Sequence, residues 1–252
     1  MSYAETVALG TIAGLTIFLG LPIARLRVLS IKHLAFLNAF AIGVLFFLFV
    51  DIIHHAAEPV EAAIKAGGRA ELWPVLAALI LGFLIGLLSL VYYGRRALAS
   101  GVHAPQQLAM LIATGLGLHN FSEGLAIGAS AQKGEIALAF TLVVGFGLHN
   151  FTEAFGIAGP LAGQRTSWGL LLSAGLLAGG PNLLGTAIGY GFSSDPVSVL
   201  FLALAGGALV FVIGELFATG RKLTEPIWNG WGIGLGFLAG ILTDLILVAA
   251  GG

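Results

Sequence analysis

Two ten-residue segments of this sequence carry the same set of metal-binding side chains. Residues 115–124 read GLGLHNFSEG and residues 145–154 read GFGLHNFTEA, so the segments are identical at seven of ten positions and lie 30 residues apart. Each contains a His, then an Asn, and a Glu four positions after the His. Imidazole, amide and carboxylate groups all bind divalent metal ions. The repeat is therefore the part of the chain best suited to chemistry.

The spacing within each segment predicts how these side chains are presented. Residues four apart lie on one face of an α-helix, about one turn from each other. Two antiparallel helices that cross at the same depth would therefore direct two imidazoles and two carboxylates to one point. We expect one metal position with four ligands, namely His119, Glu123, His149 and Glu153. A second position can be built from the oxygens of Asn120 and Asn150, with both Glu residues shared between the two positions.

Burial of these acids in a membrane is costly unless their charge is compensated. A carboxylate at the centre of a membrane helix costs roughly 2.5–3.5 kcal/mol on insertion scales, and two that face each other also repel. A divalent cation between Glu123 and Glu153 would remove both costs. Two alternatives stay open: the acids are protonated and hydrogen-bonded, or each pairs with its neighbouring His as an inert contact. The duplication favours the metal site over both.

The donor types narrow the choice of metal. Imidazole and carboxylate ligands suit Zn²⁺, Fe²⁺, Mn²⁺, Co²⁺ and Cd²⁺. The chain has no Cys, which excludes disulfides, thiolate metal sites and cysteine nucleophiles and disfavours a dedicated Cu⁺ site. The ligands do not choose among the five divalent ions.

The composition indicates where these helices lie. Of the 252 residues, 58% are hydrophobic and 9% are charged, which is the composition of a membrane protein. The net charge of −1, without a basic stripe, excludes nucleic acid as a main partner. We predict an all-α integral membrane protein with a single domain, residues 1–252. Its eight transmembrane helices are expected at about 4–26, 31–57, 72–94, 106–131, 135–161, 167–191, 196–219 and 227–250.

Basic residues in the connections predict the orientation. The first, third, fifth and seventh loops hold eight Lys or Arg residues, whereas the second and fourth hold three. The positive-inside rule then places the odd-numbered loops in the cytoplasm and both termini outside it. Seven of the eight prolines, Pro59 among them, are expected at or near helix ends. Pro181 lies inside the sixth helix, where it should free a backbone carbonyl and bend the helix.

The two HNFxE segments resemble the metal-binding motifs of the fourth and fifth helices in the Zrt/Irt-like protein (ZIP) family of divalent metal transporters. The resemblance spans the chain and includes the Gly214-Glu215-Leu216 sequence of the seventh helix. It implies a 3+2+3 helix arrangement, in which helices one, four, five and six shift like an elevator against the other four and move metal toward the cytoplasm. It also implies a primary site of His119, Glu123, His149 and Glu153, and a secondary site in which Asn120 and Asn150 join the two Glu residues.

The chain departs from the family pattern in three places. Many bacterial relatives have Glu-Pro in the sixth helix, where this chain has Gly180-Pro181, so a carboxylate of the secondary site is missing. Asn182 is a weak substitute for it and a candidate for the transport pathway. Ser122 and Thr152 replace the usual Pro of the two motifs, which leaves both helices less kinked. The third loop is short, with His103 as its single His, and does not support a cytoplasmic metal-sensing loop.

Other polar residues are candidates for a transport pathway. Acids and imidazoles follow one another at the outer end of the second helix, at Asp51, His54, His55 and Glu58. They can collect cations, or they can simply face water at a helix end. Glu215 can assist metal exit or carry a proton, and its alternative is an ion pair with Arg221 or Lys222. Asp244 has no assigned partner.

These features predict a multi-pass protein of the cell membrane that transports divalent metal ions, Zn²⁺ first, toward the cytoplasm. The metal is cargo, so no catalytic cofactor and no enzyme activity are expected; assembly as a homodimer is left open. The main alternative is an intramembrane metalloenzyme such as a hydrolase, in which the metal activates water. It is disfavoured because no HExxH segment occurs and the repeat supplies symmetric ligands. A metal sensor is disfavoured because the chain has no soluble domain through which to signal.

Overall fold

The computed structural model describes residues 1–26, 30–98, 104–161, 164–191, 194–223 and 225–249, and all regular elements within these ranges are helical. The elements are α1 (Tyr3–Leu15), α2 (Ile17–Gly20), the 3₁₀-helix η1 (Leu21–Arg25), α3 (Ile31–Ala66), α4 (Arg69–Leu98), α5 (Ala104–Gln132), α6 (Ile136–Leu161), α7 (Trp168–Gly191), α8 (Asp195–Lys222) and α9 (Pro226–Ala249). The all-α prediction is confirmed. His103 and Arg27, one of the basic residues of the first loop, lie outside the described residues.

Local sequence signals explain where several helices begin and end. At the start of α1, Ser2 Oγ accepts the Glu5 N–H at 3.3 Å and the Glu5 carboxylate accepts the Ser2 N–H at 2.8 Å, which is a capping box. Ser30 caps α3 by accepting the His33 N–H. Gly67 ends α3 with a φ of 71°, a left-handed conformation that glycine adopts without a steric penalty.

The first helical rod of the bundle, which consists of α1, α2 and η1, is interrupted at Thr16, between α1 and α2. The Thr16 N–H donates to the Ala13 carbonyl at 3.3 Å, and Thr16 Oγ1 donates to the same oxygen at 2.7 Å. Pro22 lies in the 3₁₀ turn that follows, where its missing N–H costs little. The regular hydrogen-bond ladder of α1 therefore stops just beyond Ala13, halfway along the rod.

The predicted second helix ends too early. The sequence predicts its end at about residue 57, but α3 continues to Ala66 and Pro59 lies inside it, so the placement of Pro59 at a helix end is wrong. A proline removes one helical hydrogen bond. The apolar face nevertheless continues past it, and Val60 and Ala63 are buried in a cluster with Val75 of α4 and Val199 of α8. This packing outweighs the local cost of the proline.

Seven segments are long and apolar enough to cross a membrane, which supports a multi-pass membrane protein. They are 3–25, 31–66, 69–96, 136–161, 168–191, 195–222 and 226–246. The predicted span at 106–131, which is α5, is not one of them, because its 29 residues include Gln, His, Asn, Ser and Glu side chains. The other predicted ranges agree with the observed helices to within a few residues.

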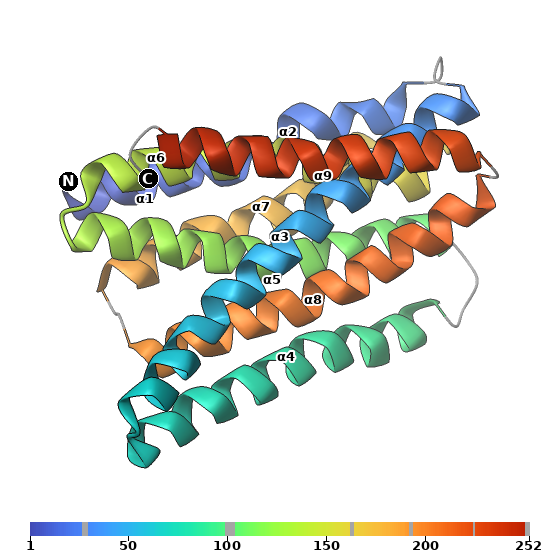
Figure 1. Cartoon of the computed structure of the whole chain (residues 1–252). Coiled ribbons are helices and arrows are strands. Elements are labelled where there is room, and N and C mark those ends of the chain that lie inside the picture. Colours follow the sequence, from blue (N-terminus) through green and yellow to red (C-terminus); the bar gives the residue numbers. More distant parts are fainter. Residues whose placement is uncertain (27–29, 99–103, 162–163, 192–193, 224, 250–252) are drawn as a thin grey trace.

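The helices form two groups (Figure 1). The first, which we call the site group, consists of α1, α2, η1, α5, α6 and α7, and its α5–α7 pair is the most extensive helix contact in the described chain. The second, which we call the frame group, consists of α3, α4, α8 and α9, with α3 packed along α9 and α4 along α8. The groups meet mainly where α5 lies against α8 and α6 lies against α3.

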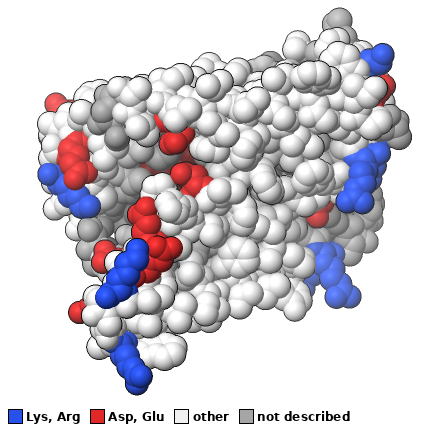
Figure 2. All heavy atoms as spheres, in the orientation of Figure 1, with Lys and Arg blue, Asp and Glu red and all other residues white. Residues whose placement is uncertain are grey.

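Charged side chains mark the two ends of the bundle (Figure 2). Lys and Arg predominate at the end where α3 begins and where α4 and α8 finish, which we call the basic end. Its helical members are Arg25, Lys32, Arg95, Arg96, Arg221 and Lys222. Acidic side chains gather toward the opposite end, where α1 begins and α9 finishes. The middle of the visible face is almost free of charge.

Candidate functional site

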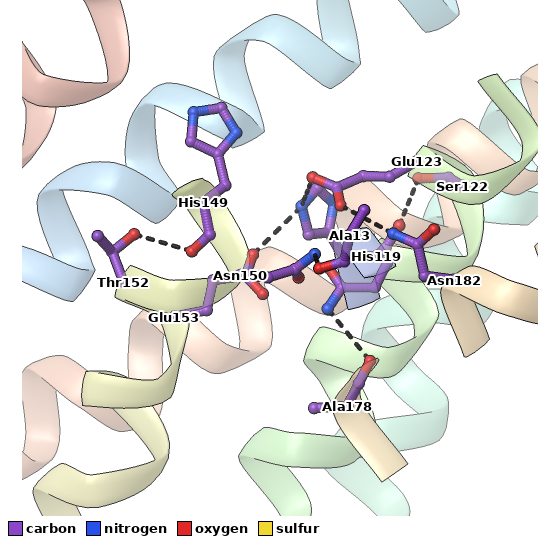
Figure 3. A network of polar contacts seen from close by, with 11 residues as sticks. Ala13, His119, Ser122, Glu123, His149, Asn150, Thr152, Glu153, Ala178 and Asn182 are labelled. Carbon is purple, nitrogen blue, oxygen red and sulfur yellow. Dashed lines mark hydrogen bonds and ion pairs between the residues drawn. The ribbon is translucent and has the colours of Figure 1, made fainter. Parts of the chain in front are cut away.

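The two halves of the repeat meet in the middle of the site group, where α5 and α6 pack side by side. His119 of α5 lies between two carboxylates (Figure 3): its Nε2 is 3.2 Å from Glu123 Oε1 and 3.3 Å from Glu153 Oε1 on α6. None of the three side chains is more than 3% exposed. The structure thus brings three of the four predicted primary ligands into contact. We call these three residues the centre.

Most polar atoms of the centre lack hydrogen-bond partners. Both ring nitrogens of His119, Glu123 Oε1 and both carboxylate oxygens of Glu153 are shielded from solvent and form no hydrogen bond, since the close N–O contacts lack hydrogen-bond geometry. A buried polar atom without a partner costs about 1–3 kcal/mol. Native proteins keep few such atoms, and a cluster of them calls for a functional explanation.

His149 does not join the centre. Its ring is 5% exposed, both ring nitrogens are unpaired, and Figure 3 shows the ring directed away from His119. Because α5 and α6 are antiparallel, the repeat should place His119 beside Glu153 and His149 beside Glu123. The first pair forms and the second does not. α6 is a regular helix at this point, with His149 one turn before Glu153. His149 therefore differs from His119 in the direction of its side chain and not in the path of the helix backbone.

Asn120 and Asn150 are fixed by backbone carbonyls of neighbouring helices. Asn120 Nδ2 donates to the Ala178 carbonyl on α7, and Asn150 Nδ2 donates to the Ala13 carbonyl on α1, each at 3.1 Å. A carbonyl only accepts, so each amide must turn its NH₂ group to that carbonyl and its oxygen elsewhere. Both Oδ1 atoms are buried and unpaired. Two amide oxygens are therefore held as acceptors. One follows His119 directly in α5, and the other lies three residues before Glu153 in α6.

Sequence reasoning missed both carbonyl anchors, which lie beside irregular points of their helices. Ala13 precedes the interruption at Thr16, and Ala178 lies three residues before Pro181, which leaves the Leu177 carbonyl without an intrahelical donor. Gly117 of α5 fits against the Leu177 carbonyl, where a Cβ would overlap the oxygen. The proline predicted to bend the sixth helix thus lies at the contact that positions Asn120.

Asn182 of α7 reaches Glu123. Its Nδ2 donates to Glu123 Oε2 at 3.4 Å, and the side chain is fully buried. Thr186 Oγ1 donates to the Asn182 carbonyl at 2.8 Å, one turn along α7. Asn182 therefore acts here as a hydrogen-bond donor to a carboxylate. No atom lies within 4 Å of the place where a Cβ at Gly180 would stand, so packing does not require glycine there.

The hydroxyls of Ser122 and Thr152 bond within their own helices. Ser122 Oγ donates to the His119 carbonyl at 2.7 Å, and Thr152 Oγ1 donates to the His149 carbonyl at 2.8 Å. Such bonds compete mildly with the helical ladder and bend a helix less than a proline does. They fix the backbone of both His residues and add no ligand.

The outer candidates form two separate pairs on α3. His54 Nε2 is 3.6 Å from Glu58 Oε1, and His55 Nδ1 is 3.5 Å from Asp51 Oδ1. Asp51 is half-buried and the other three residues are exposed. The structure thus arranges these residues as two His–carboxylate contacts at the surface, joined by edge contact of the His54 and His55 rings, and not around a single point. Glu215 is also separate from the centre, since it lines a groove between α4 and α8 together with Arg95.

In the described part of the chain, no three His, Asp or Glu side chains are arranged as a complete metal site. At the centre, His119 Nε2 is in contact with one oxygen of each carboxylate. Comparison with known proteins finds no family model and no curated protein that matches this chain. The functional conclusion therefore rests on the chemistry of the centre itself.

Proposed function

We propose that this chain carries a divalent transition-metal ion across a membrane, with Zn²⁺ as the first candidate and Fe²⁺, Mn²⁺, Co²⁺ and Cd²⁺ as others. The observation that carries the proposal is the contact of His119 with Glu123 and Glu153, at most 3% exposed, in a chain with only 9% charged residues. Two buried carboxylates repel each other and lose hydration. A bound dication removes both penalties, and its departure restores them, which suits a site that must also release its ion.

The distances at the centre support this chemistry. Two ligands that each lie about 2.0–2.1 Å from a tetrahedral Zn²⁺ are about 3.3 Å apart, and the two N–O separations at His119 are 3.2 and 3.3 Å. In our proposal His149 turns toward Glu123 when the ion binds and supplies the fourth ligand.

The anchored amides support a weaker second position. Oδ1 of Asn120 and Oδ1 of Asn150 are buried and unpaired, but both are neutral. Asn182 meets Glu123 as a donor, and no carboxylate is present at Gly180. Because fewer negative charges hold a second dication less well, the proposal is one firmly bound ion per chain.

The resemblance to the ZIP family supplies the transport geometry of the proposal. We take α5 as an eighth span, because 29 residues of helix extend about 43 Å and its polar side chains face other helices. An even number of spans places both termini on the same side of the membrane. This agrees with Figure 1, in which α1 begins and α9 ends at the same end of the bundle. The positive-inside rule assigns the basic end to the cytoplasm. The ion then moves toward the basic end as the site group shifts against the frame group.

Flux into liposomes tests the proposal. Purified protein should admit Zn²⁺ to an internal fluorescent indicator, and His149→Ala and Glu153→Ala should each abolish the signal while the protein keeps its thermal unfolding transition. The control is Glu61→Gln, which removes an exposed carboxylate paired with Lys65 at the outer end of α3 and should leave flux unchanged. Wild-type flux in both His149→Ala and Glu153→Ala would overturn the proposal.

A further inference from the structure

Asn38 is a buried polar residue of the frame group with an unpaired oxygen. It lies about two turns from the start of α3, near the basic end, and is fully buried. Its Nδ2 donates to the Leu216 carbonyl on α8 at 3.1 Å. This bond fixes the orientation of the amide, and Oδ1 is left without a partner. An apolar residue would pack here at lower cost, so the oxygen needs an explanation.

The oxygen of Asn38 faces the site group. A Cβ built on Gly159 of α6 would stand 2.7 Å from Asn38 Oδ1, so only a glycine leaves room for the amide at this approach. Asn38 and Gly159 also line a small pocket between the two groups, together with Ala24 of η1 and Phe155 of α6. Asn38 Oδ1 is thus a polar atom at a pocket whose other walls are mostly apolar.

The pocket lies on the side of the centre nearest the basic end. Gly159 follows Glu153 by six residues, which is about 9 Å along α6. Between them, Gly156 faces the frame group, where a Cβ added to it would stand 3.2 Å from Leu216 Cδ1. Leu216 therefore connects the two places: its side chain lies over α6 between the centre and the pocket, and its carbonyl holds the Asn38 amide.

We infer that Asn38 Oδ1 is a release site for the transported divalent cation, which the ion reaches after it leaves His119, Glu123 and Glu153 toward the basic end. This inference rests on the proposed function. A single neutral amide oxygen is a hard but weak ligand. Such an oxygen lowers the energy barrier for an ion that leaves the two carboxylates, and it does not retain the ion. Conduction requires sites that bind the ion weakly enough to release it.

Kinetics of Zn²⁺ flux into liposomes test the release site. Asn38→Asp should hold the ion too firmly, and Gly159→Ala should place a methyl group 2.7 Å from Oδ1, which obstructs access of the ion to this oxygen. Both slow a step after binding, so kcat and KM should fall together by about tenfold. The matched control is Asn229→Asp. Asn229 likewise donates to an α8 carbonyl, that of Gly220 at 3.3 Å, and has an unpaired Oδ1, but it lies on α9 and does not line the pocket between the groups. The kcat and KM of this variant should stay near wild type.

A purely structural role for Asn38 predicts a different pattern. Asn38→Asp and Gly159→Ala would then each lower the unfolding temperature and the kcat with KM unchanged. That pattern, or wild-type kcat and KM in both variants, would overturn the release site while wild-type flux still supports the proposed function. If the wild-type protein moves no divalent ion, the proposed function fails and the release site fails with it.

Discussion

The site group and the frame group differ in what they bury. The helices of the site group enclose nearly all the buried polar side chains of the described chain: Thr6, His119, Asn120, Ser122, Glu123, Ser130, His149, Asn150, Glu153, Asn182 and Thr186. The described helices of the frame group bury two, Asn38 and Thr219. Buried polar groups cost free energy unless they are paired. Their concentration in one group indicates that this group carries the chemistry and that the other supports it.

Within each group, glycines bring helix backbones into direct contact. In the site group, Gly124 of α5 fits against the Asn182 carbonyl of α7, and in the frame group Gly236 of α9 fits against the Phe40 carbonyl of α3. At both positions a Cβ would overlap the backbone oxygen. Backbone atoms cannot move aside as side chains can, so these contacts hold each group together as a unit.

At the boundary between the groups, glycines face side chains. A Cβ at Gly115 of α5 would meet Val212 Cγ2 at 2.5 Å, and a Cβ at Gly156 of α6 would meet Leu216 Cδ1 at 3.2 Å. Side chains can change rotamer when one helix moves past another. Some glycines within the groups also face side chains, such as Gly10 against Thr186 and Gly240 against Phe47. The described glycines at which a Cβ would overlap a backbone oxygen nevertheless make that contact within their own group, which supports the proposed shift of one group against the other.

The largest effect is expected from removing one charge at the centre. Glu153→Gln should lower Zn²⁺ affinity by roughly 100-fold or more, because a neutral amide replaces a carboxylate ligand. The same change should leave the metal-free protein as stable or more stable, since an uncompensated buried charge is removed. Isothermal titration and thermal unfolding without metal check the two effects. A loss of both affinity and stability would mean that Glu153 is structural.

The next largest effect is expected on the free energy of unfolding, when a glycine within a group and a glycine between the groups are each replaced by alanine. Gly124→Ala should destabilise the protein by about 1–3 kcal/mol, because its Cβ must displace a backbone carbonyl. Gly156→Ala should cost less than about 1 kcal/mol, because the Leu216 side chain can adjust. Unfolding in detergent measures both variants. Equal costs would contradict the distinction between rigid and adaptable contacts.

A smaller effect is expected at the anchored amides. Asn150→Leu removes the bond to the Ala13 carbonyl and one oxygen beside the centre, and should weaken Zn²⁺ binding by about 10-fold. Thr11→Val on α1, which removes only a hydroxyl bonded within its own helix, is the control and should bind as wild type. Wild-type affinity in Asn150→Leu would show that the amide oxygen does not contribute.

The smallest effect is expected at the end of the frame group opposite the basic end. His55→Ala breaks a half-exposed pair with Asp51, and such pairs contribute about 0–1 kcal/mol. Stability should therefore change little, and flux at saturating Zn²⁺ should stay within about threefold of wild type. A loss of flux comparable to that in Glu153→Gln would place part of the site in the frame group and remove the division of roles between the groups.

The sequence predicts most of the fold because the apolar runs are long and polar, Pro or Gly residues separate them. It fails at Pro59, where a local breaker is overruled by burial of Val60 and Ala63 against two other helices. Such packing depends on partners far away in sequence. The carbonyl anchors of Asn120 and Asn150 are hidden for the same reason, since backbone carbonyls leave no residue-type signal.

The repeat predicts the neighbourhood of the centre but not the direction of every side chain. Helical spacing places His119, Glu123 and Glu153 together, and the structure does so. Spacing treats His149 as equivalent to His119, yet its ring turns away, because rotamers depend on the surroundings of each helix face. The role of Gly159 is equally invisible in sequence, since it depends on the approach of Asn38 from another helix.

Metal binding at the centre can be observed in an anomalous-difference map of the protein crystallised with Cd²⁺. We predict a peak within about 2.0–2.6 Å of His119 Nε2 and of carboxylate oxygens from Glu123 and Glu153, with the His149 ring turned toward it. Glu153→Gln should lose this peak under the same conditions. Cd²⁺ bound only at the exposed pairs of His54 and His55, with none at the centre, would show that the centre is not a metal site.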